Sequence, residues 1–198
     1  MASIVWPCRP ISRPRSSPTK SAVNVSPSSR TSTSASTPTA SAIASSISVS
    51  GQEFLVTATQ LNGTGFEQFG GEVTGASGAQ PVIISAIHSA SLADLCQSVA
   101  VGPVTLRLTA GGGGNPVTAD NLIVDASGQT GSEAIFHNIT IGQDAGTLTE
   151  DPGTTGQPGG FGQQADSITI NNLVQHTWLT TAGTFTLPGL SISFGGSC

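Results

Sequence analysis

Serine and histidine are the residues from which this chain could build a hydrolytic site. Three histidines, His88, His137 and His176, lie on or beside strand-like stretches of sequence. An α/β-type esterase holds its nucleophilic serine in a Gly-x-Ser-x-Gly elbow, which lifts the hydroxyl toward a histidine base. No such pentapeptide is present, and Ser77 and Ser127, each in an Ala-Ser-Gly step typical of a turn, come nearest. A triad assembles in space, so a hydrolase stays open as an alternative, but we expect no enzymatic activity.

Acidic, histidine, cysteine and glycine spacings point to no cofactor. Five acidic residues fall in or near expected loops, but not in the spacing of a calcium EF-hand, and histidine and cysteine show no zinc spacing. These acidic residues are Asp120, Asp125, Asp144, Glu150 and Asp151. A calcium site in the loop over residues 144–151 is the alternative. The glycines of residues 111–114 lack the Lys-Ser/Thr step of a phosphate loop, which favours a flexible hairpin. We therefore predict neither a metal nor a cofactor.

Charge divides the chain near residue 50. Residues 1–50 contain five of the six basic residues and no acidic one, whereas residues 51–198 contain all eleven acidic residues and one base, Arg107. An acidic segment without lysine cannot neutralise a phosphate backbone, which excludes nucleic-acid binding by residues 51–198. No stretch approaches the roughly 18 apolar residues that span a bilayer, so no transmembrane segment is expected. Charged residues make up 9% of the chain, a low proportion typical of many secreted β proteins.

The first 46 residues are rich in serine, proline and arginine. Such a segment buries too little apolar surface to offset its ordering entropy, so we expect a disordered tail or a mis-assigned leader. A degenerate export signal and an organelle-type signal are the alternatives, although the apolar region of a signal peptide is missing. Residues 47–198 are predicted to form a single β domain.

Short stretches of alternating sequence predict β-strands through this domain. Asn62-Gly63 and residues 109–116 predict hairpin connections between strands. Residues 90–100 predict one short helix, because four apolar residues recur at helical spacing after an N-cap at Ser91. The expected strands cover residues 54–59, 82–87, 104–109, 122–125, 135–141, 168–174 and 185–194.

A step from a polar or small residue to Leu or Ile recurs along the expected strands. Its occurrences are separated by 26, 35, 17, 34 and 17 residues, and three of these intervals are multiples of 17. Two architectures fit: an antiparallel sandwich or folded-over jelly roll, and a β-solenoid. The hairpin-like connections favour the antiparallel, all-β form. The six steps are Gln60-Leu61, Ala86-Ile87, Asn121-Leu122, Asn138-Ile139, Asn172-Leu173 and Gly189-Leu190.

Cys96 and Cys198 are the only cysteines of the expected domain. The chain has nine aromatic residues and no tyrosine, so its core is expected to be aliphatic, and a disulfide would add to its stability. A disulfide between the two closes a loop of about 100 residues. The entropy that this loop removes from the unfolded chain is worth roughly 4–5 kcal/mol of stability. We expect this structural disulfide, and with it an oxidising compartment. The alternative is two separate thiols, and Cys8 is expected to be incidental.

Five segments of residues 47–198 form a recognisable set: LCQSV at 95–99, GPVTLRLTAG at 102–111, ITIGQD at 139–144, FGQQAD at 161–166 and TAGTF at 181–185. The set resembles an actinobacterial, Streptomyces-type family of exported proteins of unknown function, whose members often carry the label cholesterol esterase. The resemblance begins at Ser48 and implies an extracellular or envelope location, with two cysteines that match Cys96 and Cys198. Members usually begin with a hydrophobic export or anchor segment, which the polar tail replaces here. A wrong start codon or shifted reading frame would explain that departure.

We expect residues 47–198 to be a non-catalytic secreted or cell-envelope β domain that binds a lipid-like or other apolar ligand, or an envelope partner. Residues 56–63 and 117–122 resemble the repeats of folded-over β proteins that carry lipids, an analogy at the level of fold. One alternative is a lipid or sterol ester hydrolase. Another is a structural protein whose lysine-poor strand edges assemble into surface arrays. The sequence gives no oligomeric state.

Overall fold

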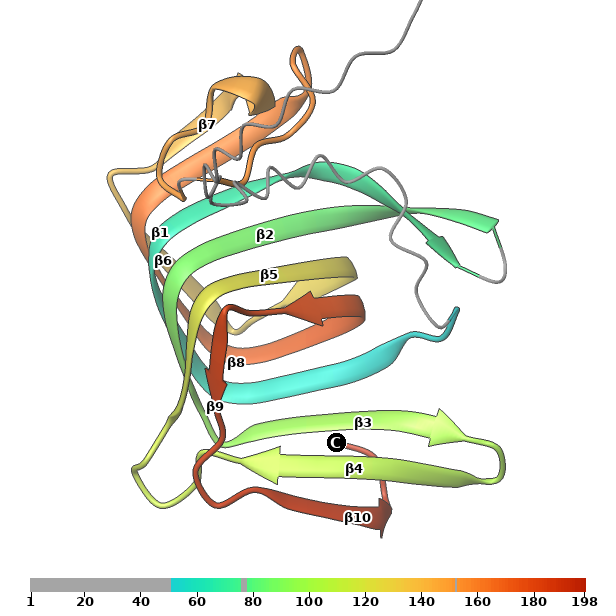
Figure 1. Cartoon of the computed structure of the whole chain (residues 1–198). Coiled ribbons are helices and arrows are strands. Elements are labelled where there is room, and N and C mark those ends of the chain that lie inside the picture. Colours follow the sequence, from blue (N-terminus) through green and yellow to red (C-terminus); the bar gives the residue numbers. More distant parts are fainter. Residues whose placement is uncertain (1–50, 76–77, 152) are drawn as a thin grey trace, which may run out of the picture. The chain divides into compact units, whose positions relative to one another are not determined.

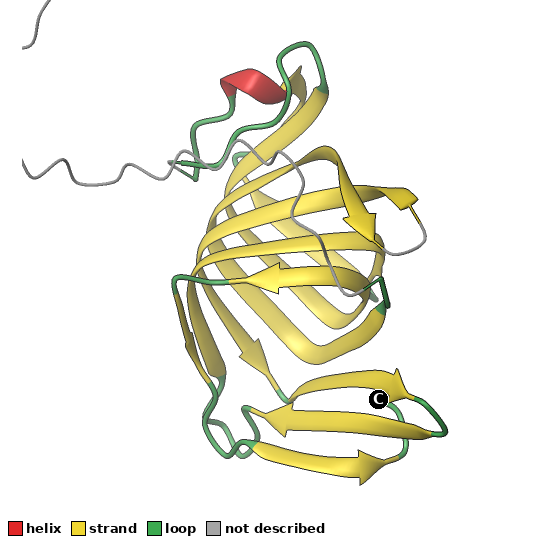
Figure 2. Cartoon of the chain, turned by 45° about the vertical axis from the view of Figure 1, so that its right-hand side comes forward, coloured by secondary structure: helices red, strands yellow, loops and turns green. Residues whose placement is uncertain are grey.

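The computed structural model describes residues 51–75, 78–151 and 153–198, which form a ten-stranded sheet (Figures 1 and 2). The tail expected over residues 1–46 lies outside the described residues. The strands are β1 Phe54–Gly75, β2 Gly78–Ala93, β3 Leu95–Val101, β4 Val104–Ala110, β5 Val117–Thr130, β6 Glu133–His137, β7 Thr140–Asp144, β8 Phe161–Thr181, β9 Thr184–Thr186 and β10 Ser191–Gly195. A 3₁₀ turn over Ala145–Thr147 follows β7.

All ten ladders among the described residues are antiparallel. The strand order is β10-β4-β3-β1-β2-β5-β8-β6, with β7 paired to β8 and β9 paired to β5. This confirms the expected antiparallel, sandwich-like form and differs from the stacked rungs of a solenoid. Within the described residues, no helix is long and apolar enough to cross a bilayer.

The long strands β1, β2, β5 and β8 curl around the main core, and Phe69, Ala145 and Leu148 form a second, smaller cluster (Figure 1). β1 pairs with β2 on one edge and with β8 on the other, while β5 pairs with both β2 and β8. The hydrogen-bonded circuit β1–β2–β5–β8 therefore returns to β1, and the enclosed side chains are almost all aliphatic. The largest fully buried apolar side chains are Phe66, Leu95, Leu173 and Val117.

The strands bend at residues with a left-handed backbone. Among the non-glycine residues of this kind, three belong to the repeated step seen in the sequence, and Gly189 of the same repeat has φ 65°. Asn and Asp tolerate this conformation because their short polar side chains bond locally. The other two positions of the repeat, Gln60 and Ala86, lie on ordinary strand. The left-handed non-glycine residues are Asp94, Asn121, Asn138 and Asn172.

The bends at Asp94, Asn121 and Asn172 change which set of alternate residues faces the core. On β8, Ile168 and Ile170 are buried before Asn172, whereas Leu173 and Gln175 are buried after it. One residue outside the pleat shifts the period-two alternation by one position. A strand of 21 residues can therefore wrap around the core and keep one set of side chains buried along its length.

Two of the expected connections were wrong. Asn62-Gly63 lies inside β1, where a Cβ on Gly63 would come within 2.6 Å of Ile87 Cγ2 and 3.2 Å of Ile168 Cγ2. Glycine therefore stands here because neighbouring side chains approach the backbone closely, rather than for a turn. Residues 109–116 do end β4 and lead to β5, but those two strands are not neighbours in the sheet, so the connection is no hairpin.

The short helix expected over residues 90–100 was also wrong. These residues form the end of β2, a turn at Asp94 and most of β3. Ala90 and Leu92 are buried at the period of a strand, and Leu95 is buried after the left-handed residue. The left-handed residue Asp94 adds one position between the alternating pattern of β2 and that of β3. Leu92 and Leu95 are therefore three residues apart, which is also the spacing expected of a helix.

Candidate apolar binding site

Strands β3, β4 and β10 form a three-stranded segment, here called the flap, whose two faces differ. Side chains that are paired across a ladder point to the same face of a sheet. The ladders align Val99 with Leu106 and Leu106 with Phe194. They also align Leu108 with Ile192 in the next row. The apolar face of the flap consists of Val99, Val101, Val104, Leu106, Leu108, Ile192 and Phe194.

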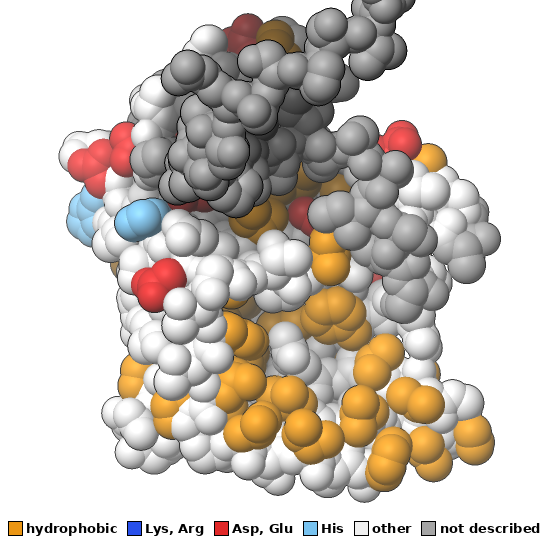
Figure 3. Space-filling view, viewed as in Figure 1, with side chains coloured by type: hydrophobic (Ala, Val, Ile, Leu, Met, Phe, Trp, Pro, Cys, Tyr) orange, Lys and Arg blue, Asp and Glu red, His pale blue; other side chains and the backbone are white. Residues whose placement is uncertain are grey.

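Much of the apolar face is open to solvent. The exposed fraction is 69% for Phe194, 60% for Ile192, 48% for Val101 and 46% for Val104. Figure 3 shows apolar side chains gathered around a hollow in the lower half of this view, over the part where Figure 1 draws the flap. Contiguous exposed apolar patches on proteins usually mark interaction sites.

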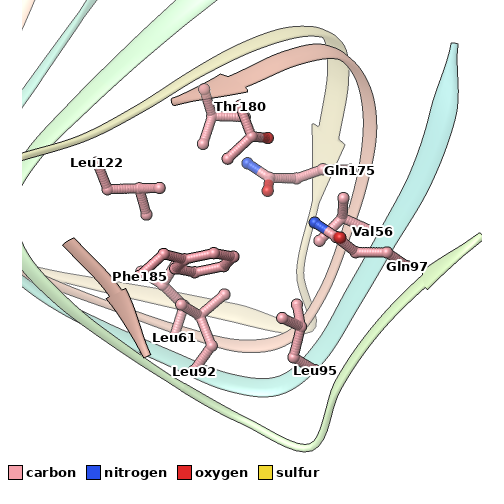
Figure 4. A pocket seen from close by; sticks show the side chains of 10 residues that line it. Val56, Leu61, Leu92, Leu95, Gln97, Leu122, Gln175, Thr180 and Phe185 are labelled. Carbon is pink, nitrogen blue, oxygen red and sulfur yellow. The ribbon is translucent and has the colours of Figure 1, made fainter. Parts of the chain in front are cut away.

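A small pocket lies where the apolar face meets the curled strands (Figure 4). Val56 of β1 pairs with Gln97 on one side and Gln175 on the other, so both amides share its face of the sheet. The pocket volume is about 20 Å³, room for about one water molecule, so it cannot enclose a ligand. It provides polar groups at the end of an apolar surface. Its lining is Val56, Leu61, Leu92, Leu95, Gln97, Leu122, Val124, Gln175, Thr180 and Phe185.

The opposite face of the flap holds the disulfide between Cys96 and Cys198. Arg107 Nε donates a hydrogen bond to Cys96 Sγ at 3.3 Å, and the Cys198 backbone N–H donates to Ser98 Oγ at 3.1 Å. Arg107 is the single basic residue of residues 51–198. Because it lies on this face, the apolar face carries no cation.

The three histidines lie on different strands, His88 on β2, His137 on β6 and His176 on β8. Ser77 lies outside the described residues, whereas Ser127 occupies an irregular stretch of β5, between the register shifts of its ladder with β8. Ser127 is therefore part of a strand, not of the turn that its neighbours suggested.

Ser127 and His176 come together with Glu53, but in the wrong order for a triad. The Ser127 hydroxyl donates to Glu53 Oε1, and the other oxygen of Glu53 lies 4.0 Å from His176 Nδ1. In a triad the imidazole stands between serine and carboxylate, where it can take the serine proton. Here the carboxylate stands between them, so His176 cannot act as the base for Ser127 in this arrangement.

A buried carboxyl, Glu67, was missed in the sequence because a lone acid in a strand gives no pattern. It is fully buried, and its Oε1 accepts a hydrogen bond from the Asp151 backbone N–H at 2.8 Å. Its Oε2 has no partner among the described residues. Burial raises the pKa of Glu67, and the hydrogen bond from Asp151 opposes this rise. Asp151 is itself buried, with Oδ1 3.7 Å from His88 Nδ1.

The acidic loop considered for calcium uses its first carboxylate to shape the backbone. Asp144 accepts from the N–H of Gly146 at 2.9 Å and from that of Gly159 at 2.8 Å, which caps the 3₁₀ turn. Across residues 51–75, 78–151 and 153–198, no three His, Cys, Asp or Glu side chains gather in a group that could hold a metal ion.

Fold and site together define an antiparallel β protein with an exposed, uncharged apolar sheet face. Residues 50–198 match the profile described as "Family of unknown function (DUF6230)", so the chain belongs to that family. Neither the curated proteins nor the solved structures contain a match to this chain.

Proposed function

We propose that residues 47–198 form a single non-catalytic domain that binds an apolar, lipid-like ligand on the apolar face of the flap. The observation that carries the proposal is the exposure of Ile192 and Phe194, at 60% and 69%, on a face without charge. Full burial of one such side chain is worth roughly 1.5–3 kcal/mol, so a ligand that covers both gains a substantial part of that free energy.

The dimensions of the face suit an extended apolar molecule. Three strand spacings of about 4.8 Å separate β10 from β1, so the row from Ile192 through Leu108 and Gln97 to Val56 is roughly 14 Å across. The pocket holds too little volume for a ligand, so we expect the ligand to lie along the open surface. The Gln97 side-chain amide at its inner end can donate and accept hydrogen bonds, whereas Gln175 is buried and its Nε2 already donates to Gln129 Oε1 at 3.0 Å.

The polar end of the ligand is expected to be uncharged. A phosphate-bearing lipid needs basic side chains to pair with its charge, and the single base of residues 51–198, Arg107, lies on the other face of the flap. A hydroxyl or ester group is the better match for the Gln97 side-chain amide. The ligand class is therefore a neutral lipid, such as a sterol or an acylglycerol.

An extracellular or envelope location is part of the proposal. The disulfide and the absence of lysine from residues 51–198 support it, because disulfides persist in oxidising compartments. The resemblance to exported actinobacterial proteins points the same way.

A lipid-ester hydrolase is the second candidate, and one observation favours it. Glu53 and His176, which lie next to Ser127, also line a surface groove together with Phe54 and Ser98. Catalysis there would require Glu53 to leave its place between the hydroxyl and the imidazole.

Extraction of bound lipid from the full chain tests the binding proposal. The purified protein and its Phe194→Ser variant are extracted with organic solvent and the extracts are compared by mass spectrometry. We expect a neutral lipid in near-stoichiometric amount from the wild type and much less from the variant. An Ile141→Ser variant is the matched control, because Ile141 is 64% exposed on β7, outside the flap. Equal lipid content in all three proteins, or none in the wild type, would overturn the proposal.

A further inference from the structure

β10 is an edge strand without the usual protection. Among the described residues it pairs with β4 alone, in a regular ladder from Ser191 to Gly195, and all five residues are exposed. Natural edge strands are commonly protected by lysine, proline, inward charges or bulges. β10 contains none of these, so within the part of the chain that the structure describes its outer edge offers unpaired backbone N–H and C=O groups to another strand.

We propose that β10 pairs antiparallel with β10 of a second copy of this chain, about a two-fold axis at Ser193. The sequence Ser-Ile-Ser-Phe-Gly alternates almost symmetrically about this residue. With Ser193 opposite its own counterpart, Ile192 faces Phe194 of the second copy. The two-fold axis repeats that apolar contact, as in other self-complementary interfaces.

The alternation also selects the register. A slip by one residue would place the serine face of one strand beside the apolar face of the other. A slip by two residues keeps the faces matched but shortens the overlap of the two five-residue strands. Pairing centred on Ser193 is the arrangement that uses all of β10 and joins the two apolar faces.

Charge and anchoring favour a second copy as the partner. The charge nearest this edge in the strand ladders is Arg107 of β4, which pairs with Ser193. Two such arginines would stand three strand spacings apart, roughly 14 Å, beyond the screening length of about 8 Å at physiological salt. The disulfide at Cys198 fixes the chain three residues after β10, so the edge is already ordered before it pairs.

Cysteine cross-linking tests the register directly, in a full chain with Cys8→Ser. Side chains opposite each other in an antiparallel pair have Cβ atoms about 4.5–5.5 Å apart. Under mild oxidation, Ser193→Cys is expected to form a covalent dimer. Ser191→Cys is the matched control on the same face of β10, and it should not cross-link because its opposite neighbour is Gly195. Equal cross-linking of both variants, or of neither, would overturn the proposal.

A negative charge introduced on the edge strand tests the monomer–dimer equilibrium. Ser193→Glu places a carboxylate beside Arg107 within one chain, which favours folding, but opposes two carboxylates across the dimer axis. We expect the dimer dissociation constant, measured by analytical ultracentrifugation, to rise at least about tenfold. Ser191→Glu should change it little. A wild-type chain that is monomeric at every concentration overturns the pairing, and so does a dimer that Ser193→Glu leaves intact.

The dimer and the ligand site can be tested independently of each other. Ser193 lies on the face of the flap opposite Ile192 and Phe194, so the monomeric Ser193→Glu variant retains the whole apolar face. Lipid content of that variant therefore reports on ligand binding alone, whereas cross-linking at residue 193 reports on pairing alone.

Discussion

Cys198, the last residue of the chain, is bonded to Cys96 of β3 although 102 positions separate them, and their Cα atoms lie 5.9 Å apart. β10 ends three residues before Cys198 and is held on the sheet by its ladder with β4. The disulfide therefore fixes the end of the chain to the flap and keeps the exposed strand in place.

Removal of this bond should weaken the fold strongly. We expect Cys198→Ser to lower the free energy of unfolding by about 4–5 kcal/mol, because the unfolded chain regains the entropy of a long loop. Guanidinium unfolding of the variant and of the wild type measures the loss. Cys8→Ser is the control and should leave the value unchanged. A variant as stable as the wild type would show that the bond contributes nothing to the fold.

The left-handed bends should reject β-branched residues. Asn121 has φ 50° and an exposed side chain, so Asn121→Val is expected to cost about 1–2 kcal/mol through the backbone alone. Asn121→Gly should be tolerated, since glycine adopts this conformation freely. Thr118→Val, on an ordinary exposed position of β5, is the control. If valine costs the same at both positions, the bends do not depend on local residue type.

Glu67 should make stability fall as the pH rises. Burial raises its pKa above the ordinary value of 4.5, so the folded chain keeps a proton that the unfolded chain releases. The stabilisation is complete below that value and is lost as the pH rises toward the folded-state pKa. Glu67→Gln retains an oxygen acceptor for the Asp151 N–H but cannot ionise.

Unfolding free energies measured at a series of pH values test this prediction. The Glu67→Gln variant should lose less stability than the wild type above about pH 4.5. Glu72→Gln, at an exposed position of the same strand, is the control. Identical pH profiles for wild type and Glu67→Gln would contradict the buried position of this carboxyl.

Ester hydrolysis should not depend on Ser127. Because Glu53 separates its hydroxyl from His176, Ser127→Ala is expected to leave the hydrolysis of nitrophenyl acyl esters at the wild-type level, equal to that of a protein-free blank. His176→Ala is the companion variant. Wild-type hydrolysis above the blank that disappears in either variant would favour the hydrolase over the binding domain.

Strand character could be predicted from the sequence more readily than strand length. Alternation of Val, Ile and Thr indicates antiparallel strands, and the recurring Asn-Leu and Asn-Ile steps are visible without a structure. Asn121 and Asn172 both bend strands that continue beyond them, although the strand expected over residues 122–125 began only after Asn121. Whether an asparagine ends a strand or bends it depends on the neighbouring strands, which local sequence does not contain.

The apolar face could not be found from the sequence. Ile192 and Phe194 alternate with serines in the same way as Ile168 and Ile170 alternate with polar residues, yet the first pair is exposed and the second buried. The difference arises because β10 belongs to the flap, outside the hydrogen-bonded circuit β1–β2–β5–β8, whereas Ile168 and Ile170 of β8 pack in the core that this circuit encloses. The position of a strand in the folded sheet, rather than its residue types, therefore decides whether its apolar side chains are buried or exposed.

The most direct test of the central claim is a titration of the full chain with a naturally fluorescent sterol. We predict saturable binding that Phe194→Ser weakens tenfold or more, since the lost burial is worth roughly 1.5–3 kcal/mol, and that Ile141→Ser leaves unchanged. Absence of saturable binding, or equal weakening by both substitutions, would contradict a neutral-lipid site on the apolar face of the flap.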